Sequence, residues 1–258
     1  HVYAPDANNS PAGDIAHERT EASYDDHTAL ARFACNIDAV TSEFENVPAS
    51  TMAFLSQHCV ASPGQAALHT AQHRIREKSL AHDLGIKTPR FWHVTDSADL
   101  TKAMAELDGD GILKTCQLGY DGKGQVRVSK NDDLATAFAA LQTNDAILEE
   151  MIPFQAEVSF LVARAVDGSL SSFPASLNEH KNGILARSVA PAALPDTVIH
   201  EGKAAASVLA EALDLVGLLA LETFLTEDNH LLFNEIAPRP HNSFHWSIEG
   251  CETSQFTQ

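Results

Sequence analysis

The stretch LVGLLALETFLTEDNHLLFNEIAPRPHNSFHW, residues 215–246, decides the fold because it holds two apolar strands followed by a dense group of polar residues. We expect strands at about 218–226 and 231–236, joined by the polar turn EDNH at 227–230. A four-residue turn sets the register of this hairpin and pairs Thr226 with Leu231, Phe224 with Phe233 and Glu222 with Glu235.

The pair Glu222 and Glu235 places two carboxylates on one face of the hairpin. Their Cβ atoms would lie about 5 Å apart, where like charges destabilise a strand pair unless a positive group lies between them. A hard cation such as Mg²⁺ takes one or two carboxylates and completes its shell with water and substrate phosphates, so the pair indicates nucleotide chemistry. Two solvated acids on a water-facing strand are the alternative.

The residues behind the second strand favour a site. Residues 234–243 place an amide, a carboxylate, a guanidinium and an imidazole close together. Here the chain resembles the ATP-grasp ligases and, within them, the N5-carboxyaminoimidazole ribonucleotide synthetase family of purine biosynthesis. The family ending NE-APR-HNSGHW is matched from Asn234 to Trp246, except that Phe244 replaces a glycine. A phenyl ring there is expected to crowd the substrate.

Composition limits the classes of protein that the chain can belong to. Its 258 residues are 44% hydrophobic and 20% charged, which is typical of a globular protein. Neither a run of eighteen apolar residues nor a signal peptide is seen, so we expect no membrane span or export. Four widely spaced cysteines without a CxxC pair indicate reduced thiols in a cytoplasm. A formal charge of −18 disfavours a nucleic-acid partner but permits a small anionic substrate.

Residues 1–62 predict an α/β unit with a parallel sheet, because short strands alternate with helices. Ligands of such sheets lie at the carboxyl ends of strands, which places residues 41–46 at a rim. The segment TSEFENVP there resembles the EFENVP signature of the family's N-terminal domain. The family's GGGQLG turn is absent and the chain starts inside a strand, so we expect a fragment lacking the extreme N-terminus and the C-terminal small domain. The expected strands are 2–4 and 37–41, and the expected helices are 26–35 and one ending near 58.

A helical stretch from residue 66 to 84, closed by Gly85, follows a turn at 62–64. Arg74 and Lys78 lie four residues apart and share one helix face, which in isolation is usually a solvated basic face. The resemblance to the family pattern D-R-x-x-x-K implies that Arg74 lies near the nucleotide. His73 stands where the family usually has aspartate.

A strand at 111–114 delivers Lys114 to the glycine-rich segment GYDGKGQ at 119–125. Exposed backbone N–H groups of such a loop can surround phosphate oxygens, although neither a Walker motif nor a dinucleotide fingerprint is present. A plain hairpin with a glycine turn is the alternative. In the family, the lysine and this loop bind the nucleotide phosphates. The chain departs from its relatives at Cys116-Gln117-Leu118, where Arg-Thr-Gly or similar is usual, and Leu118 restricts the loop.

Two further strands, at about 147–152 and 156–164, carry acids that could simply be surface residues of an edge strand. The resemblance instead implies that Glu149, Glu150, Met151 and Ile152 line the adenine and that Glu157 binds the ribose region. The segment NEHKNGIL at 178–185 resembles the family's N-x-H-x-x-G-I-L, which implies that His180 belongs to the nucleotide site. The helix expected at 195–214 is Ala- and Leu-rich and predicts packing.

The resemblance covers the whole chain and implies a mixed α/β protein of three parts. These are a partial Rossmann-like pre-ATP-grasp domain at 1–62, a small ATP-grasp lobe at 63–145 and a large ATP-grasp lobe at 146–258. It also implies a homodimer with ATP and Mg²⁺, or Mn²⁺ as an alternative ion, as cofactors.

The implied reaction is ATP-dependent carboxylation of 5-aminoimidazole ribonucleotide, in which bicarbonate attacks the γ-phosphate to give carboxyphosphate. Glu222 and Glu235 would hold the metal. Nucleotide contacts are assigned to Arg74, Lys114, Gly119, Tyr120, Asp121, Gly122, Lys123, Gly124, Gln125, Glu149, Glu150, Met151, Ile152, Glu157, His180, Asn234 and Glu235. Bicarbonate and substrate are assigned to Tyr120, Lys181, Arg239, His241 and Asn242. Another ATP-grasp ligase or transformylase, or a non-catalytic ATP-binding remnant, stays open as the alternative.

Overall fold

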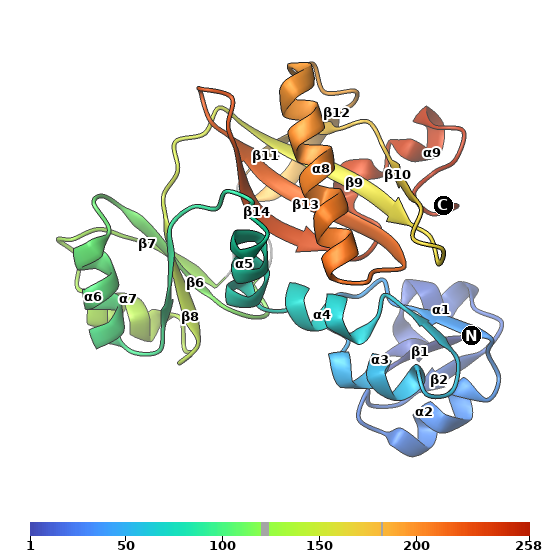
Figure 1. Ribbon diagram of the computed structural model, residues 1–258. Coiled ribbons are helices and arrows are strands. Elements are labelled where there is room, and N and C mark those ends of the chain that lie inside the picture. The colour runs from blue at the N-terminus through green and yellow to red at the C-terminus, as the bar shows by residue number, and fades with distance from the viewer. Residues whose placement is uncertain (120–123, 182) are drawn as a thin grey trace.

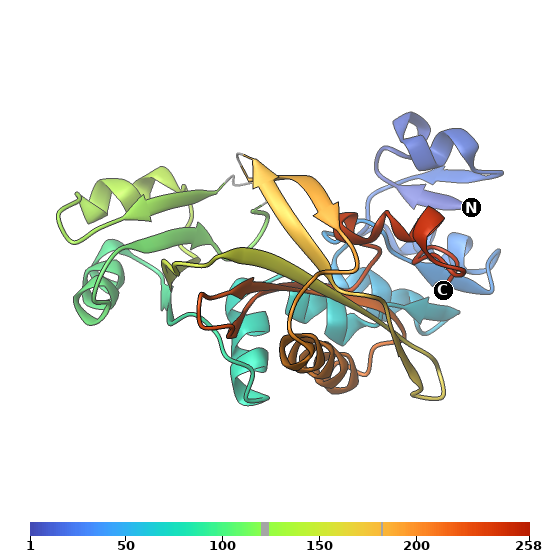
Figure 2. The ribbon, with the colours of Figure 1, turned by 90° about the horizontal axis from the view of Figure 1, so that it is seen from above.

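The computed structural model describes residues 1–119, 124–181 and 183–258 and shows a mixed α/β protein built of three units. The N-terminal unit and the small lobe lie on opposite sides of the large lobe (Figures 1 and 2). No helix in these described ranges is long and apolar enough to cross a membrane.

The N-terminal unit alternates strands and helices as expected. Its strands pair in parallel, β1 with β2 and β3 with β4, and Asp26 caps helix α2 by accepting from the N–H groups of Thr28 and Ala29. Leu30 and Met52 belong to its core. The elements are β1 (Val2–Ala4), η1 (Ala7–Asn9), α1 (Pro11–Ile15), β2 (Arg19–Glu21), α2 (His27–Ala34), β3 (Ala39–Thr41), α3 (Ala49–Leu55) and β4 (Val60–Ser62).

The connection to the ATP-grasp lobes differs from the single helix that was expected. It consists of α4 (Gln65–Ala71) and α5 (Arg74–Asp83), separated at Gln72 and His73. His73 has extended backbone angles, and its ring contacts Asp145 at 3.1 Å. The Gln72 side chain donates to two backbone carbonyls of the N-terminal unit. These distant partners interrupt the helix, and they are not visible in the local sequence pattern.

The small lobe is a four-stranded antiparallel sheet in the order β5-β8-β6-β7, covered on one face by two helices. Strand β8 is central, so the edge-strand alternative is wrong for it. Because β8 pairs with β5 and β6, the sheet of this lobe extends to Glu150, beyond the boundary expected at residue 145, while the division into three domains stays a prediction. The elements are β5 (Phe91–Val94), α6 (Ser97–Glu106), β6 (Gly111–Thr115), β7 (Gln125–Val128), α7 (Leu134–Ala140) and β8 (Ala146–Glu150).

The large lobe is a six-stranded sheet in the order β12-β11-β9-β13-β14, with β10 paired to β9. Helix α8 packs across one face, as expected, and it lies so close that a Cβ on Gly202 would meet the Phe160 ring at 2.0 Å. The elements are β9 (Ala156–Arg164), β10 (Leu170–Ser172), β11 (Ser176–Lys181), β12 (Ile184–Val189), α8 (Asp196–Ala212), β13 (Gly217–Leu225), β14 (Leu231–Ala237), η2 (Asn242–Phe244) and α9 (Ser247–Gly250).

The hairpin β13–β14 has a different register near its turn from the one expected. Leu231 pairs with Leu225 rather than with Thr226. A register shift between Glu222 and Thr223, opposite the extra residue Asn234, then restores the expected pairing of Glu222 with Glu235. The shift also changes which face each side chain occupies, so Phe233 is buried beneath α8 whereas Phe224 lines a cavity on the other face.

Candidate active site

A cavity of about 590 Å³ lies where the three units meet. Each unit contributes polar side chains to its wall, and most of the residues predicted from the sequence are among them. Those are Arg74, Lys114, Gly119, Gln125, Glu157, His180, Glu222, Asn234, Glu235, Arg239, His241 and Asn242.

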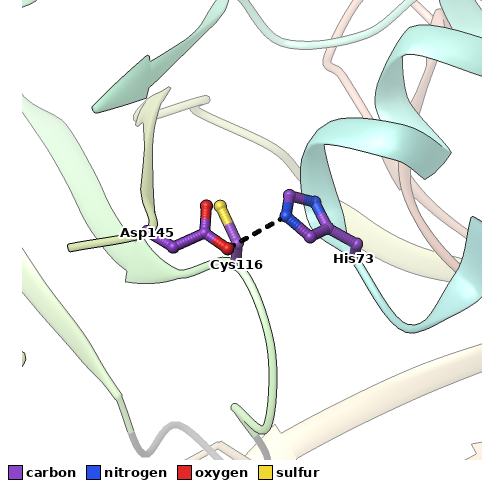
Figure 3. Close-up of side chains that lie close together, drawn as sticks. All are labelled: His73, Cys116 and Asp145. Atoms are coloured by element: carbon purple, nitrogen blue, oxygen red, sulfur yellow. Dashed lines mark hydrogen bonds and ion pairs between the residues drawn. The ribbon is translucent and has the colours of Figure 1, made fainter. Parts of the chain in front are cut away.

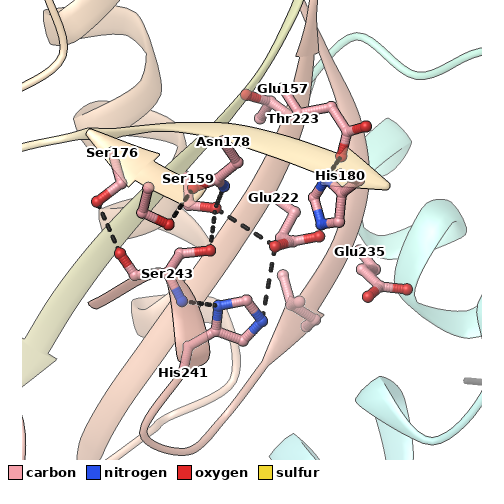
Figure 4. Close-up of polar contacts among 12 residues, drawn as sticks. Glu157, Ser159, Ser176, Asn178, His180, Glu222, Thr223, Glu235, His241 and Ser243 are labelled. Carbon is pink, nitrogen blue, oxygen red and sulfur yellow. Dashed lines mark hydrogen bonds and ion pairs between the residues drawn. The ribbon is translucent and has the colours of Figure 1, made fainter. Parts of the chain in front are cut away.

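The expected carboxylate pair stands in the wall of this cavity (Figure 4). Glu222 is nearly buried; it accepts a hydrogen bond from Ser159 at 3.3 Å and lies 3.6 Å from Nε2 of His241. Burial first, and then the neighbouring Glu235, raise the pKa of Glu222 to about 8. Burial and the adjacent Arg239 lower the pKa of His241 to about 4, so at pH 7 the imidazole is neutral, and the Glu222 carboxyl beside it is mostly protonated.

Glu235 has a permanent counter-charge. Its carboxylate accepts a hydrogen bond from Nη1 of Arg74 at 3.0 Å. Burial acts to raise the pKa of Glu235, but Arg74 outweighs it and holds the pKa below its ordinary value. The hard oxygen atoms of Glu222 and Glu235 fit a divalent cation such as Mg²⁺ or Mn²⁺, and the charge of such an ion would favour the ionised form of Glu222.

Two lysine side chains contact the buried carboxylate of Glu149. Nζ of Lys114 lies 2.9 Å from one oxygen of this buried carboxylate, and Nζ of Lys78 lies 3.5 Å from the other. Burial alone would raise the pKa of Glu149, but the two ammonium groups lower it to about 2. Glu149 thus positions Lys114, which lines the cavity, and this role corrects the expected contact of Glu149 with adenine.

Lys78 is fully buried, so the solvated basic face considered for α5 is wrong. Besides Glu149, it contacts the large lobe by donating to the backbone carbonyl of Asn234 at 2.8 Å. On the same helix Glu77 accepts from the N–H of Ile236 at 3.1 Å. Helix α5 therefore contacts both lobes: it binds Glu149 on β8 of the small lobe and the backbone of β14 in the large lobe.

The N-terminal unit reaches the cavity through Glu45, which lies at the expected rim. Its carboxylate accepts from Nε of Arg239 at 3.0 Å and from Nη2 at 2.5 Å. Glu45 is one of the site residues absent from the predicted set, although the EFENVP signature had indicated its position. Gln72, Glu77, Phe154 and Phe224 also line the cavity without having been predicted.

Also in the cavity wall, and near Glu222, Glu157 and His180 form a close pair (Figure 4), with 2.8 Å between Oε2 and Nδ1. The interaction with Glu157 raises the pKa of His180 above its ordinary value. The rings of Phe154 and Phe224 stack beside them with centroids 4.7 Å apart. This part of the cavity wall offers an aromatic surface next to a charged pair, which suits a nucleoside.

Several predicted residues have other surroundings. Tyr120, Asp121, Gly122 and Lys123 lie outside the described residues. Gly124, Glu150, Met151, Ile152 and Lys181 are described but do not line the cavity. Glu150 pairs with Arg90 at 3.0 Å, and the backbone N–H groups of Glu150 and Met151 already donate to the carbonyls of Arg90 and Asp110. Those two N–H groups are therefore not free to bind a base, in contrast to the expectation.

Phe244 and Leu118, the two apolar residues that depart from the family motifs, have different surroundings. Phe244 is fully buried in a small core with Leu161 and Phe173, so the expected crowding of the substrate by its ring is wrong. Leu118 lines the cavity, is 73% exposed and has φ of 60°, a conformation that favours glycine. The strained conformation belongs to Leu118 itself, and the expected restriction of the following residues 120–123 lies outside the described residues.

Comparisons with known proteins agree with this architecture. The ribonucleotide synthetase preATP-grasp domain family matches residues 1–72, and the ATP-grasp domain family matches residues 79–256. The fold and the site together define an ATP-grasp ligase.

Individual relatives narrow the class. The N5-carboxyaminoimidazole ribonucleotide synthase of Brucella melitensis is 44% identical over 250 residues, which cover 96% of this chain and 69% of that protein. The ADP complex of an N5-carboxyaminoimidazole ribonucleotide synthetase superposes with a TM-score of 0.91 at 40% identity, covering 97% of this chain and 66% of the other. The Aspergillus clavatus enzyme in complex with ADP and 5-aminoimidazole ribonucleotide has a TM-score of 0.88 at 27% identity, covering 97% and 66%.

The chain belongs to the N5-carboxyaminoimidazole ribonucleotide synthase family. It spans about two thirds of the length of the relatives that it matches.

Proposed function

We propose that the chain carries out the ATP- and bicarbonate-dependent carboxylation of 5-aminoimidazole ribonucleotide to N5-carboxyaminoimidazole ribonucleotide. Bicarbonate attacks the γ-phosphorus of ATP, ADP leaves, and the resulting carboxyphosphate transfers its carboxyl group to the exocyclic amine as phosphate departs. The observation that carries the proposal is the pair Glu222 and Glu235, which faces a cavity that also holds Arg74 and Lys114.

Phosphoryl transfer needs positioned reactants and neutralised charge more than covalent chemistry by the protein. Lys114 and Arg74 supply fixed positive charge for the phosphates of ATP. Glu222 and Glu235 would hold Mg²⁺, or Mn²⁺ in its place, which supplies charge neutralisation and orientation of the phosphate oxygens when bound. Gly119 and Gln125, at the two ends of the glycine-rich segment, lie in the same wall.

The substrate end of the proposed site is the region around Arg239, His241 and Asn242. Glu45 holds the Arg239 guanidinium through two of its nitrogen atoms, which fixes the plane in which the remaining N–H groups are presented. A neutral His241 beside this cation suits a step in which an amine must lose a proton. The structure of the Aspergillus clavatus relative with bound 5-aminoimidazole ribonucleotide supports this choice of substrate.

Glu157 and His180 are proposed to contact the nucleoside of ATP beside the Phe154 and Phe224 rings. The similar structure of an N5-carboxyaminoimidazole ribonucleotide synthetase with bound ADP supports a nucleotide at this cavity. A homodimer is proposed for the assembled enzyme because the family resemblance implies it. A cytoplasmic location is proposed because the four cysteines are widely spaced and form no CxxC pair.

The test is phosphate release from Mg-ATP and bicarbonate, measured with and without 5-aminoimidazole ribonucleotide. Glu235→Gln removes one carboxylate of the pair, and Glu227→Gln in the turn of the same hairpin is the matched control. We expect stimulation by the ribonucleotide in the wild type and in E227Q, and its loss in E235Q. An extended version of the chain is assayed in parallel, so that a missing segment is not mistaken for a missing activity.

Other outcomes of this assay would replace the proposal. Stimulation by a different amine or acid in a substrate panel would indicate another ATP-grasp ligase or transformylase. ATP binding without phosphate release under any of these conditions, in both versions of the chain, would indicate a non-catalytic remnant.

A further inference from the structure

A second group of metal-ligating side chains lies at the edge of the cavity, away from the carboxylate pair. His73, Cys116 and Asp145 each offer one ligand atom, and these atoms all lie within 4.8 Å of one another (Figure 3). They come from the start of α5, the end of β6 and the start of β8. Within the described residues, this is the group that combines sulfur, nitrogen and oxygen donors in this way.

Asp145 is the centre of the group. One of its oxygens lies 3.1 Å from Nε2 of His73, and the other lies 2.9 Å from Nε2 of His93 on β5. Neighbouring ligand atoms of a tetrahedral zinc ion are about 3.3 Å apart, given metal–ligand bonds of about 2.0 Å. His93 is half exposed, and its Nε2 contacts the same carboxylate as His73 does.

The backbone already holds the three segments together. The N–H of Arg74 donates to the carbonyl of Cys116 at 3.0 Å, and the N–H of Cys116 donates to the carbonyl of Asp145 at 3.0 Å. The positions of the three Cβ atoms are therefore set before any ion binds, and only side-chain rotations are needed to close a site. Such preorganisation lowers the entropy lost on binding.

The donor chemistry selects the class of ion. A thiolate and imidazoles are soft and borderline ligands, which favour Zn²⁺ and related transition metals over Mg²⁺. A thiolate and one carboxylate carry two negative charges, which match one divalent cation. An ordinary cysteine thiol is mostly protonated at pH 7, so binding of an ion to Cys116 must release a proton.

We propose that His73, Cys116 and Asp145, with His93 as the fourth ligand, form a binding site for Zn²⁺ or a similar transition-metal ion, separate from the Glu222–Glu235 pair. An ion there ties the start of α5 to two strands of the small lobe. Cys116 lines the cavity and directly precedes Gln117 and Leu118, so the ion also fixes the segment that leads into the glycine-rich region. Both His73 and Cys116 are positions at which this chain departs from the motifs that it otherwise matches.

The test is a Co²⁺ titration of the chelator-treated chain, with excess Mg²⁺ present to occupy the Glu222–Glu235 pair. We expect a thiolate-to-cobalt charge-transfer band that saturates at one equivalent and is abolished by one equivalent of Zn²⁺. Cys116→Ser should abolish the band, and Cys35→Ser, which removes an exposed thiol elsewhere, should retain it. His93→Asn should weaken Co²⁺ binding by at least about tenfold.

Circular dichroism establishes that each variant is folded, and Asp145→Asn is a second variant that keeps the shape of the group. The absence of a thiolate band in the wild type would overturn the proposal. So would equal Zn²⁺ affinities of the wild type, C116S and D145N, which would place the ion elsewhere. An unchanged affinity in H93N would overturn the assignment of the fourth ligand.

Discussion

At the scale of single residues, the Glu149 carboxylate compensates the positive charges of Lys78 and Lys114. Glu149→Gln would leave both buried ammonium groups without their carboxylate. We expect the free energy of unfolding at pH 7 to fall by about 3–5 kcal/mol, as when one partner of a buried ion pair is removed. Chemical denaturation measures this. Glu150→Gln, on the neighbouring and more exposed residue, is the control and should cost less than about 1 kcal/mol.

The same pair of variants predicts a pH dependence. The pKa of Glu149 in the folded protein is about 2, below its ordinary value of 4.5. A depressed pKa means that the folded state binds fewer protons than the unfolded state, so this stabilisation is complete above pH 4.5 and is lost as the pH falls toward 2. The stability difference between wild type and E149Q should therefore shrink across that window. A difference that stays constant down to pH 2 would contradict the assignment.

Phe244 gives a second prediction at this scale. Because the ring is buried in a small core rather than directed at the cavity, Phe244→Ala should lower the free energy of unfolding by about 3–5 kcal/mol. The Michaelis constants for ATP and for the ribonucleotide should stay unchanged at a temperature where the variant is folded. A lowered Michaelis constant for the ribonucleotide would instead mean that the ring does crowd the substrate.

At the scale of structural elements, the segment before the glycine-rich loop is strained at Leu118. Leu118→Gly should relieve the left-handed conformation and raise the free energy of unfolding by about 1 kcal/mol. Gln142→Gly is the matched control, because Gln142 is also exposed and has φ of 54°, but lies outside the cavity wall. Both variants should gain similar stability, whereas L118G alone should change the rate of ADP release in stopped-flow measurements.

The secondary-structure elements also show which parts of the fold could be predicted from the sequence alone. Apolar strands with a short polar turn predicted the β13–β14 hairpin and the pairing of Glu222 with Glu235. The register near the turn was wrong because a bulge at Asn234 depends on neighbours such as Lys78, which no local pattern contains. The break between α4 and α5 was missed for the same reason, since the partner of His73 lies 72 residues away.

The candidate site was predictable where a motif names both the residue and its neighbours, as at Lys114 and the carboxylate pair. The site was not predictable where the role of one side chain is to position another side chain. The family resemblance assigned Glu149 to adenine, but its burial between two lysines depends on the packing of α5 against β8. Charge compensation of this kind is a property of the folded molecule.

At the scale of the whole molecule, Glu45 and Arg239 join the N-terminal unit to the large lobe. Glu45→Gln should reduce the stimulation of phosphate release by the ribonucleotide about tenfold or more, because the Arg239 guanidinium loses the partner that orients it. The affinity for ADP should not change. A double-mutant cycle with Arg239→Gln is the measurement, and the double variant should be no worse than R239Q alone. Additive effects would show that the two residues act separately.

The placement of α5 has a consequence for synthesis of the chain. Its polar side chains find partners on β14 that are made much later: Arg74, Lys78 and Glu77 contact positions 161, 156 and 159 residues further on. A nascent chain on the ribosome therefore carries α5 with charged groups exposed to water until β14 has been translated. A chain that ends before β14 lacks Glu235 and the partners of α5, so the proposed nucleotide site forms only when synthesis of the hairpin is complete.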